Sequence, residues 1–390
     1  MKFISKTVWI LSIVSLCTDL ASEMLYPIMP IYLKSIGFSI FLIGILEGIA
    51  EATAGLSKGY FGKQSDLTGK RVPFVRIGYL LSAVSKPMMA VFVNPFLIFF
   101  ARTTDRFGKG IRTGARDAIL SDESTRETKA SVFGFHRSMD TMGAVLGPLI
   151  ALIFLYYNPE NYRILFMIAF LPGIIAVIFS FLIKESGNSK SVQRKKNSFF
   201  TFLNYWKESN TGYKKLIIGL LVFALFNSSD VFLILKVKQS GIDDSYVIGI
   251  YIFYNLIYAL FSLPLGILAD KIGVKKVFIL GLTIFMIVYF GMSFATKPIQ
   301  FIVLFFLYGV FSAATEGISK AWITLVSDKK DTATAIGLFS GIQSLCAFTA
   351  SSITGLIWYS YGGTAAFLIT AITSLFVILY FSLVIKQSKN

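Results

Sequence analysis

Long apolar stretches recur along the whole chain, and short polar connections separate them. Each stretch is about 20 residues or longer, the length that a helix needs to cross the hydrocarbon core of a bilayer. No segment has the alternating ten-residue pattern of a membrane β-barrel, so helices are the remaining structure that satisfies backbone hydrogen bonds in lipid. The pattern predicts an all-α membrane protein with twelve spans, at 7–33, 40–61, 73–93, 95–118, 131–156, 163–184, 216–236, 246–268, 276–296, 299–324, 333–359 and 363–385.

The composition agrees with this interpretation, because 55% of the 390 residues are hydrophobic and only 15% are charged. A folded core cannot hide so many large apolar side chains, so lipid must cover much of the surface. The N-terminal stretch lacks a small-residue cleavage site, and we expect it to be retained as the first span. Both cysteines, Cys17 and Cys346, lie in predicted spans, so a disulfide framework is not indicated.

The formal net charge of +16 is unevenly distributed between the two sides of the predicted spans. Connections on one side carry Lys58, Lys63, Lys70, Arg71, Arg76, Arg126, Lys129, Lys271, Lys275, Lys276, Lys329 and Lys330. This asymmetry is the positive-inside pattern of membrane proteins. We therefore expect a multi-pass protein of the cytoplasmic membrane with both termini in the cytoplasm. Topology and lipid contact explain the basic charge, and no nucleic-acid partner is expected.

One connection, residues 185–215, is long, polar and basic, and it separates six spans from six. We expect a bundle at 1–184, a cytoplasmic linker at 185–215 and a second bundle at 216–390. The linker contains the aromatic run "FFTFLNYW", which is compatible with a plain tether or with an amphipathic helix at the membrane surface. We expect a tether with one face on the membrane.

The two halves share sequence patterns. "GKQSDLTGKR" begins at Gly62 and "GILADKIGVKK" begins at Gly266, 204 positions later (266 − 62). Shorter matches with about the same offset include "KSIG" at 34–37 with "KQSG" at 238–241. The chain is therefore expected to consist of two halves of common origin. Parallel repeats of this kind place a substrate site near the bilayer midplane.

The repeated phrase, Gly-x-x-x-Asp-x-x-Gly followed by basic residues, resembles the signature loop of the major facilitator superfamily. The resemblance covers essentially the whole chain and implies two six-helix bundles related by a pseudo-twofold axis. It also implies that the loop latches the cytoplasmic side and opens during transport. Asp66 and Asp270 can each face a helix N-terminus or a nearby arginine. The predicted gate residues are Gly62, Asp66, Gly69, Lys70, Arg71, Arg112, Arg116, Gly266, Asp270 and Gly273, with Arg112 and Arg116 as expected partners of Asp66. The first copy departs from the usual pattern at Gln64-Ser65.

A second resemblance lies in the fifth span, where "GAVLGP" contains Gly143, Gly147 and Pro148. It is similar to a motif common in the family's proton-driven exporters. Small residues permit close helix approach, and proline bends a helix. Generic helix packing explains the same residues.

Charged residues inside spans are costly in lipid, so each should face protein or water and have a partner. Asp19 and Glu23 lie one turn apart in the first span, beside Tyr26-Pro27. Burial and a nearby arginine shift a carboxyl pKa in opposite directions, so such groups suit proton uptake and release. Asp19, Glu23 and Asp230 are the proton-coupling candidates, and a structural salt bridge is the alternative.

The fourth span carries a basic stripe. Arg102 occupies the position of an arginine that the family links to proton coupling, but Asp105 and Arg106 replace the usual Gln and Gly. Arg102, Arg106 and Lys109 share one helix face. This stripe suits an anionic solute, since arginine grips carboxylate or phosphate with two hydrogen bonds. Internal pairing with Asp19, Glu23, Glu47 and Glu51 is an equal alternative. The substrate-binding candidates are Arg102, Asp105, Arg106, Lys109, Tyr26, Asn227 and Glu316.

No common catalytic, phosphate-loop or metal-ligand motif occurs, so no enzyme, metal or cofactor is expected. The sequence predicts a monomeric, proton-coupled secondary transporter that works by alternating access. The expected substrate is a small organic solute, and an anion is favoured over a cation. One alternative is a drug/proton antiporter for lipophilic compounds. A second is a non-transporting sensor or scaffold with the same fold.

Overall fold

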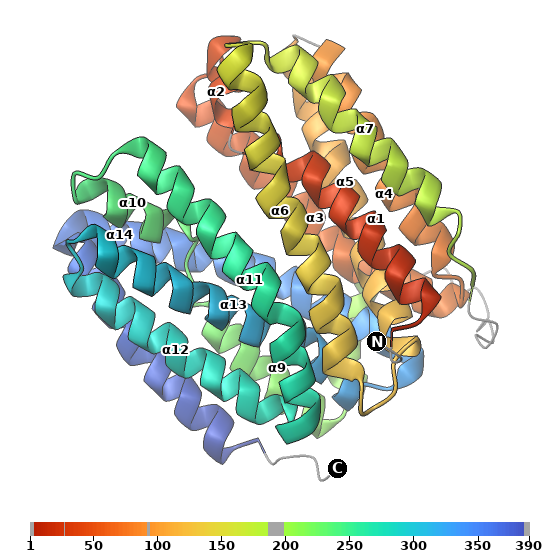
Figure 1. Cartoon of the computed structure of the whole chain (residues 1–390). Coiled ribbons are helices and arrows are strands. Elements are labelled where there is room, and N and C mark those ends of the chain that lie inside the picture. Colours follow the sequence, from red (N-terminus) through yellow and green to blue (C-terminus); the bar gives the residue numbers. More distant parts are fainter. Residues whose placement is uncertain (1–3, 27, 92–93, 186–198, 386–390) are drawn as a thin grey trace. The chain divides into compact units, whose positions relative to one another are not determined.

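The computed structural model describes residues 4–26, 28–91, 94–185 and 199–385, and within these ranges all regular structure is helical (Figure 1). The helices are α1 (Lys6–Glu23), α2 (Met29–Ser35), α3 (Ile40–Thr68), α4 (Val72–Val91), α5 (Pro95–Asp122), α6 (Lys129–Tyr157), α7 (Tyr162–Ser180), η1 (Phe199–Asn204), α8 (Tyr205–Glu208), α9 (Thr211–Ala224), α10 (Val231–Gln239), α11 (Asp244–Ile272), α12 (Val274–Phe294), α13 (Pro298–Val326), η2 (Lys329–Asp331) and α14 (Thr332–Leu383). Most of the predicted linker, 186–198, lies outside the described residues.

These helices account for twelve spans. Within the described residues, seven helical segments are long and apolar enough to cross a membrane by themselves. The longest, α14, is two spans joined at Gly362, whose φ of 84° and ψ of 166° are not helical. The other spans are α3 and α5, which carry many charges, and two helix pairs in which a span is interrupted. The predicted all-helical, twelve-span architecture is therefore confirmed.

The two interrupted spans occupy equivalent places in the sequence repeat. The first is broken between α1 and α2, after Glu23, and the second between α9 and α10, around Asn227. These two residues are 204 positions apart (227 − 23), the same offset as the repeated loops. The prolines after Tyr26 explain the first break, since proline cannot continue a helical hydrogen-bond ladder. The second break contains no proline.

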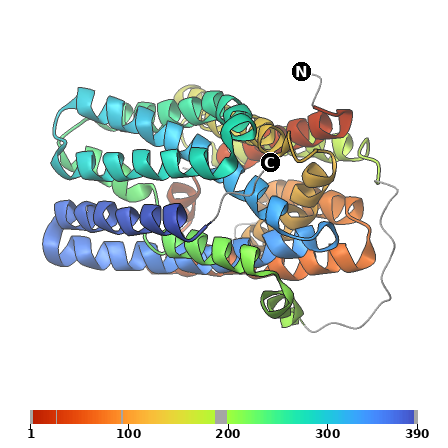
Figure 2. The same ribbon diagram turned by 90° about the horizontal axis from the view of Figure 1, so that it is seen from below.

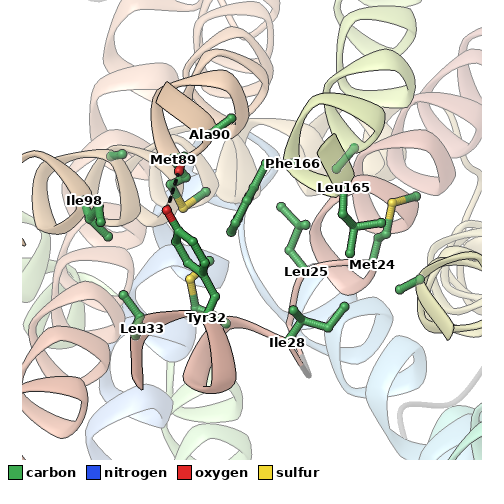
Figure 3. Packing of buried hydrophobic residues seen from close by; sticks show 14 of the residues in the cluster. Met24, Leu25, Ile28, Tyr32, Leu33, Met89, Ala90, Ile98, Leu165 and Phe166 are labelled. Atoms are coloured by element: carbon green, nitrogen blue, oxygen red, sulfur yellow. Dashed lines mark hydrogen bonds between the residues drawn. The ribbon is translucent and has the colours of Figure 1, made fainter. Parts of the chain in front are cut away.

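The chain divides into two compact units. The first comprises residues 1–125, 139–208 and 328–341, and in it α5 packs between α3 and α4. One of its cores surrounds Tyr32, which lies edge-on to Phe166 with ring centroids 5.0 Å apart and donates a hydrogen bond to the Met89 carbonyl at 3.3 Å (Figure 3). This packing holds α2 against α4 and α7.

The second unit comprises residues 126–138, 209–327 and 342–390. Its helices α11, α12 and α13 lie side by side (Figure 1, Figure 2). Aromatic rings fill the core between them, including Phe223, Phe285 and Phe311, with centroids of the last two 4.7 Å apart. Large apolar side chains also cover the outside, such as Phe348 at 70% exposure and Phe376 at 65%. Such a surface is stable only in contact with lipid.

Candidate functional site

The basic stripe of α5 lies partly in the interior of the first unit. Arg102 and Arg106 are buried, and Lys109, one turn further on, is exposed. Four-residue and three-residue spacing places the three on one helix face, as the sequence predicts. The helix thus presents two shielded guanidinium groups followed by an accessible ammonium group.

A buried network surrounds Asp105. Lys86 of α4 places its Nζ 2.7 Å from Asp105 Oδ1 and 3.2 Å from Ser22 Oγ, and Arg102 approaches the other carboxylate oxygen at 3.6 Å. Lys86 is 1% exposed, so its ion pair is fully withdrawn from solvent. The sequence analysis missed Lys86, although a lysine well inside the predicted third span was a usable signal.

Arg106 has a more accessible partner. Its Nε lies 3.2 Å from Glu51 Oε1 on α3, and the Glu51 side chain is 52% exposed. The side chain of Glu47 lies outside the described residues. Arg106 thus pairs with one of the acids expected from the sequence, and Lys109 is an accessible cation on the same helix.

The carboxylates of α1 face α5 and α6. Asp140, Lys109 and Glu23 are the ionisable neighbours of Asp19. Asp140 further accepts a hydrogen bond from the Ser15 hydroxyl. Asp19 and Asp140 thus form a pair of neighbouring carboxyl groups within the first unit.

Gly143 and Gly147 bring α6 against α1. A Cβ at Gly143 would lie 2.6 Å from the Leu16 carbonyl oxygen, and one at Gly147 would lie 2.7 Å from the Met24 nitrogen. Pro148 follows inside α6. The close approach places Asp140 of α6 beside Asp19, so the packing motif positions the carboxyl pair.

Arg112 and Arg116 do not contact Asp66 in this structure. Arg112 lies over the Tyr79 ring, 4.7 Å from its centroid, and donates to Ser82 Oγ at 2.6 Å. Arg116 pairs with Asp117 at 2.9 Å and donates to Ser15 Oγ at 3.3 Å. Both arginines are therefore part of the buried polar interior of the first unit, and Arg116 reaches the carboxyl pair through Ser15.

Asp66 instead caps the start of α14. Its carboxylate accepts hydrogen bonds from the Thr334 N–H and hydroxyl, both at 2.7 Å, and from the Ala333 N–H at 3.4 Å. Arg71 approaches at 3.4 Å. Burial raises the pKa of Asp66 to about 6, against the opposing effects of Arg71 and the Thr334 hydrogen bonds. A carboxylate at a helix N-terminus is stabilised by the free N–H groups there.

Asp270 repeats this arrangement in the second unit. It accepts hydrogen bonds from the Ala130 N–H at 2.8 Å and from the Ser131 N–H at 2.7 Å, and a third from the Ser131 hydroxyl. These residues begin α6. Each acidic loop of the repeat thus binds a helix start that belongs to the other half of the sequence.

The glycines of both loops permit this approach. A Cβ at Gly62 would lie 2.4 Å from the Ala333 carbonyl oxygen, and one at Gly266 would lie 2.5 Å from that of Ala130. Gly69 and Gly273 have positive φ, 63° and 101°, where a side chain would be strained. Beside them Lys70 is exposed, and Arg71 also pairs with Asp122.

The second unit has its own polar group around Asp230. The Tyr308 hydroxyl donates to Asp230 Oδ1 at 2.5 Å, and the rings of Tyr254 and Tyr308 are 5.1 Å apart. Nearby on α13, Glu316 pairs with Arg137 at 3.2 Å. Sequence reasoning missed these tyrosines because the chain holds 18 and their pattern does not set them apart. Tyr26, by contrast, is 48% exposed beyond the end of α1.

The observations define a class of protein. The chain has the features of a membrane transport protein. These are lipid-covered helices, two repeated halves, spans broken at equivalent places, and shielded ionisable groups inside the spans. A family model described as the Major Facilitator Superfamily matches residues 11–254 and again 216–390. The chain belongs to that superfamily and is a multi-pass membrane transporter.

Relatives support the assignment. An uncharacterized MFS-type transporter of Methanocaldococcus jannaschii is 33% identical over 387 residues, covering 96% of this chain and 95% of the relative. The quinolone resistance protein NorA of Staphylococcus aureus is 26% identical over 184 residues, or 46% of each chain.

Solved structures share the fold. The Escherichia coli fucose:proton symporter FucP covers 98% of this chain and 98% of its own with a TM-score of 0.80 and 12% identity. The human organic anion transporter MFSD10 covers 96% of this chain and 98% of its own with a TM-score of 0.79 and 14% identity. At these identities the likeness shows the fold alone.

Proposed function

We propose that this protein is a proton-coupled secondary transporter that moves a small organic anion across the cytoplasmic membrane by alternating access. The observation that carries the proposal is the basic face of α5. Arg106 is shielded, yet its partner Glu51 is 52% exposed. A solute carboxylate can replace Glu51 on Arg106 with the same charge-assisted geometry. The organic anion named for MFSD10 is consistent with this substrate class.

Proton coupling is supported by the carboxyl pair. Asp19 and Asp140 are neighbouring carboxyl groups whose repulsion a bound proton would relieve, and Lys109 is a charged neighbour of Asp19. A movement that brings a cation closer would favour release of that proton, and a movement that withdraws it would favour uptake. Glu23 has the same lysine as a charged neighbour and is the next candidate in this relay.

The two acidic loops supply the latch that alternating access needs. Asp66 binds the start of α14, and Asp270 binds the start of α6, each through at least two backbone N–H groups. Such caps are strong when intact and are lost as a unit when the helix start moves away. In this proposal the loops face the cytoplasm, as do both termini, and the carrier acts as a monomer.

The first test compares pools of anionic and cationic solutes added to purified protein, recording thermal stabilisation and proton release together. We expect anions to stabilise the protein, and Arg106→Ala to weaken their binding at least about tenfold, because a charge-assisted hydrogen bond contributes about 1.5–3 kcal/mol. The exposed Arg163→Ala is the matched control. Stabilisation by lipophilic cations alone would refute the anion proposal.

The same assay tests coupling. Asp19→Asn should bind the solute without the proton signal, because an amide cannot release a proton. If the proton signal persists in Asp19→Asn and in Glu23→Gln, the coupling group lies elsewhere, with Asp140 and Asp230 as the remaining carboxyl candidates.

A drug/proton antiporter is the second candidate function. It is favoured by the Gly143–Gly147 packing motif and by the partial similarity to NorA, a quinolone resistance protein. Stabilisation by cationic lipophilic compounds, unaffected by Arg106→Ala, would select this alternative.

A further inference from the structure

The break between α9 and α10 leaves backbone oxygens of the second unit without helical partners. Residues 225–230 are not helical, and the carbonyls of residues 224–228 accept no hydrogen bond within the described part of the chain. Unwound backbone in a membrane protein is stable only where protein, water or an ion satisfies it. In broken spans of transporters such carbonyls bind monovalent cations.

Side-chain oxygens without partners gather at the same place. Ser228 Oγ and Asn227 Oδ1 are buried without a hydrogen bond, and so is the Tyr289 hydroxyl of α12. Ser228 is 3% exposed and Tyr289 is 0% exposed. The hydroxyls of Tyr289, Ser228 and Tyr308 are neighbours, although the first two make no hydrogen bond of normal geometry. A buried orphan oxygen in a native protein indicates a bound water or ion.

The segment also carries a carboxyl group. Asp230 does not cap α10, and its carboxylate turns to Tyr308, which occupies Oδ1. Among the residues that the structure describes, no lysine or arginine pairs with Asp230. The nearby acid Glu316 pairs with Arg137, which also donates to Tyr258. An ionised Asp230 would therefore leave the break negatively charged, and a bound cation would neutralise it.

We propose that the break between α9 and α10 is a sodium site, formed by Asp230, Ser228, Asn227, Tyr289 and the unwound carbonyls. One carboxylate among neutral oxygens matches a hard monovalent cation. No group of three or more metal-ligating side chains occurs among the described residues, so a divalent site of that type is not expected here. The site is separate from the carboxyl pair of α1 and α6 and does not rest on the proposed substrate.

The test measures the melting temperature of the purified protein in NaCl, KCl and choline chloride at equal ionic strength. We expect a saturable rise of about 3 °C in sodium only, because a ligand that binds the folded state alone stabilises it. Asp230→Asn should abolish this rise. Equal melting temperatures in sodium and choline, or an equal rise in potassium, would overturn the proposal.

Two milder variants keep the test decisive if Asp230→Asn fails to fold. Tyr289→Phe and Ser228→Ala each remove one orphan hydroxyl, so neither should lower the melting temperature without sodium. Each should raise the half-saturating sodium concentration about tenfold. Ser293→Ala is the matched control, since this buried serine bonds the Tyr289 carbonyl of its own helix at 3.0 Å. Unchanged sodium dependence in both variants would refute the site, and loss of the response in Asp19→Asn would move it to the first unit.

Discussion

At the scale of single residues, Lys86 shows how a transporter keeps charge inside a membrane. Its ammonium is withdrawn from solvent, and two groups, Asp105 and Ser22, bind it directly. A buried ion pair contributes little net stability relative to a well-packed apolar pair, but the loss of one partner leaves an uncompensated charge. Loss of Lys86 would therefore leave the buried carboxylate of Asp105 without this ammonium partner.

Lys86→Met should destabilise the protein by about 3–5 kcal/mol, because the carboxylate of Asp105 would remain buried with less compensation. The double variant Lys86→Met/Asp105→Asn should recover most of that loss, since both charges are removed. Thermal unfolding in detergent measures both, with the exposed Lys34→Met as control. If the double variant is no more stable than the single one, the pair is not the source of the effect.

At the scale of elements, glycine sets the distance between α3 and the start of α14. Gly62 meets backbone across that contact, whereas a Cβ at Gly48, on the same helix, would meet nothing within 4 Å. The backbone carbonyl of Ala333 cannot rotate aside as a flexible side chain would. The contact between the acidic loop and the helix start therefore depends on the absence of a side chain at one position.

Gly62→Ala should weaken the Asp66 cap and lower transport, because the added methyl group forces α3 and α14 apart. Gly48→Ala should leave transport unchanged and can stabilise α3 by up to about 1 kcal/mol, through the better helix propensity of alanine. A transport assay with expression-matched variants distinguishes the two. Full activity in Gly62→Ala would show that the contact is not needed in the cycle.

The elements were only partly predictable from sequence. The spans followed from apolar length, and Tyr26-Pro27 indicated the first interruption. The interruption at 225–230 has no proline and no glycine, and its only sequence signal is the run Asn227-Ser228-Ser229-Asp230, residue types that favour turns and helix caps. The position of Arg112 was likewise beyond sequence reasoning, because helix periodicity gives the face of a residue and not its partner on a distant helix. Tyr79 and Ser82, which hold Arg112, lie in a separate span.

At the scale of the whole molecule, the Asp66 cap links proton concentration to conformation. Its pKa is about 6 in the capped state, whereas a solvated aspartate has a pKa near 3.9. The capped state thus binds a proton more tightly, and it should gain stability as the pH falls from above 6 toward about 4. The slope cannot exceed about 1.4 kcal/mol per pH unit for one proton.

The rate at which a thiol reagent labels a cysteine placed at Thr334 should report this dependence. A cysteine placed at Lys297 is the control. Because the substitution at Thr334 itself removes one hydrogen bond, Ala335→Cys is the second reporter. The labelling rate near the cap, divided by the rate at the control position, should fall as the pH falls through 6, because the thiolate fraction changes at both positions. Asp66→Asn should make this ratio independent of pH. Labelling that accelerates on acidification would contradict the assigned sign.

The exchanged helix starts also impose an order on biosynthesis. Asp270 accepts hydrogen bonds from Ala130 and Ser131, which are synthesised before it. Asp66 must wait for Thr334, 268 residues later, and at about 5–20 residues per second this delay is roughly 13–54 s. During that interval the Asp66 loop of the nascent first half has no partner, because the start of α14 has not been synthesised. The translocon must therefore tolerate an unfinished first half until the last two spans arrive, and premature termination before Thr332 would leave that loop permanently unsatisfied.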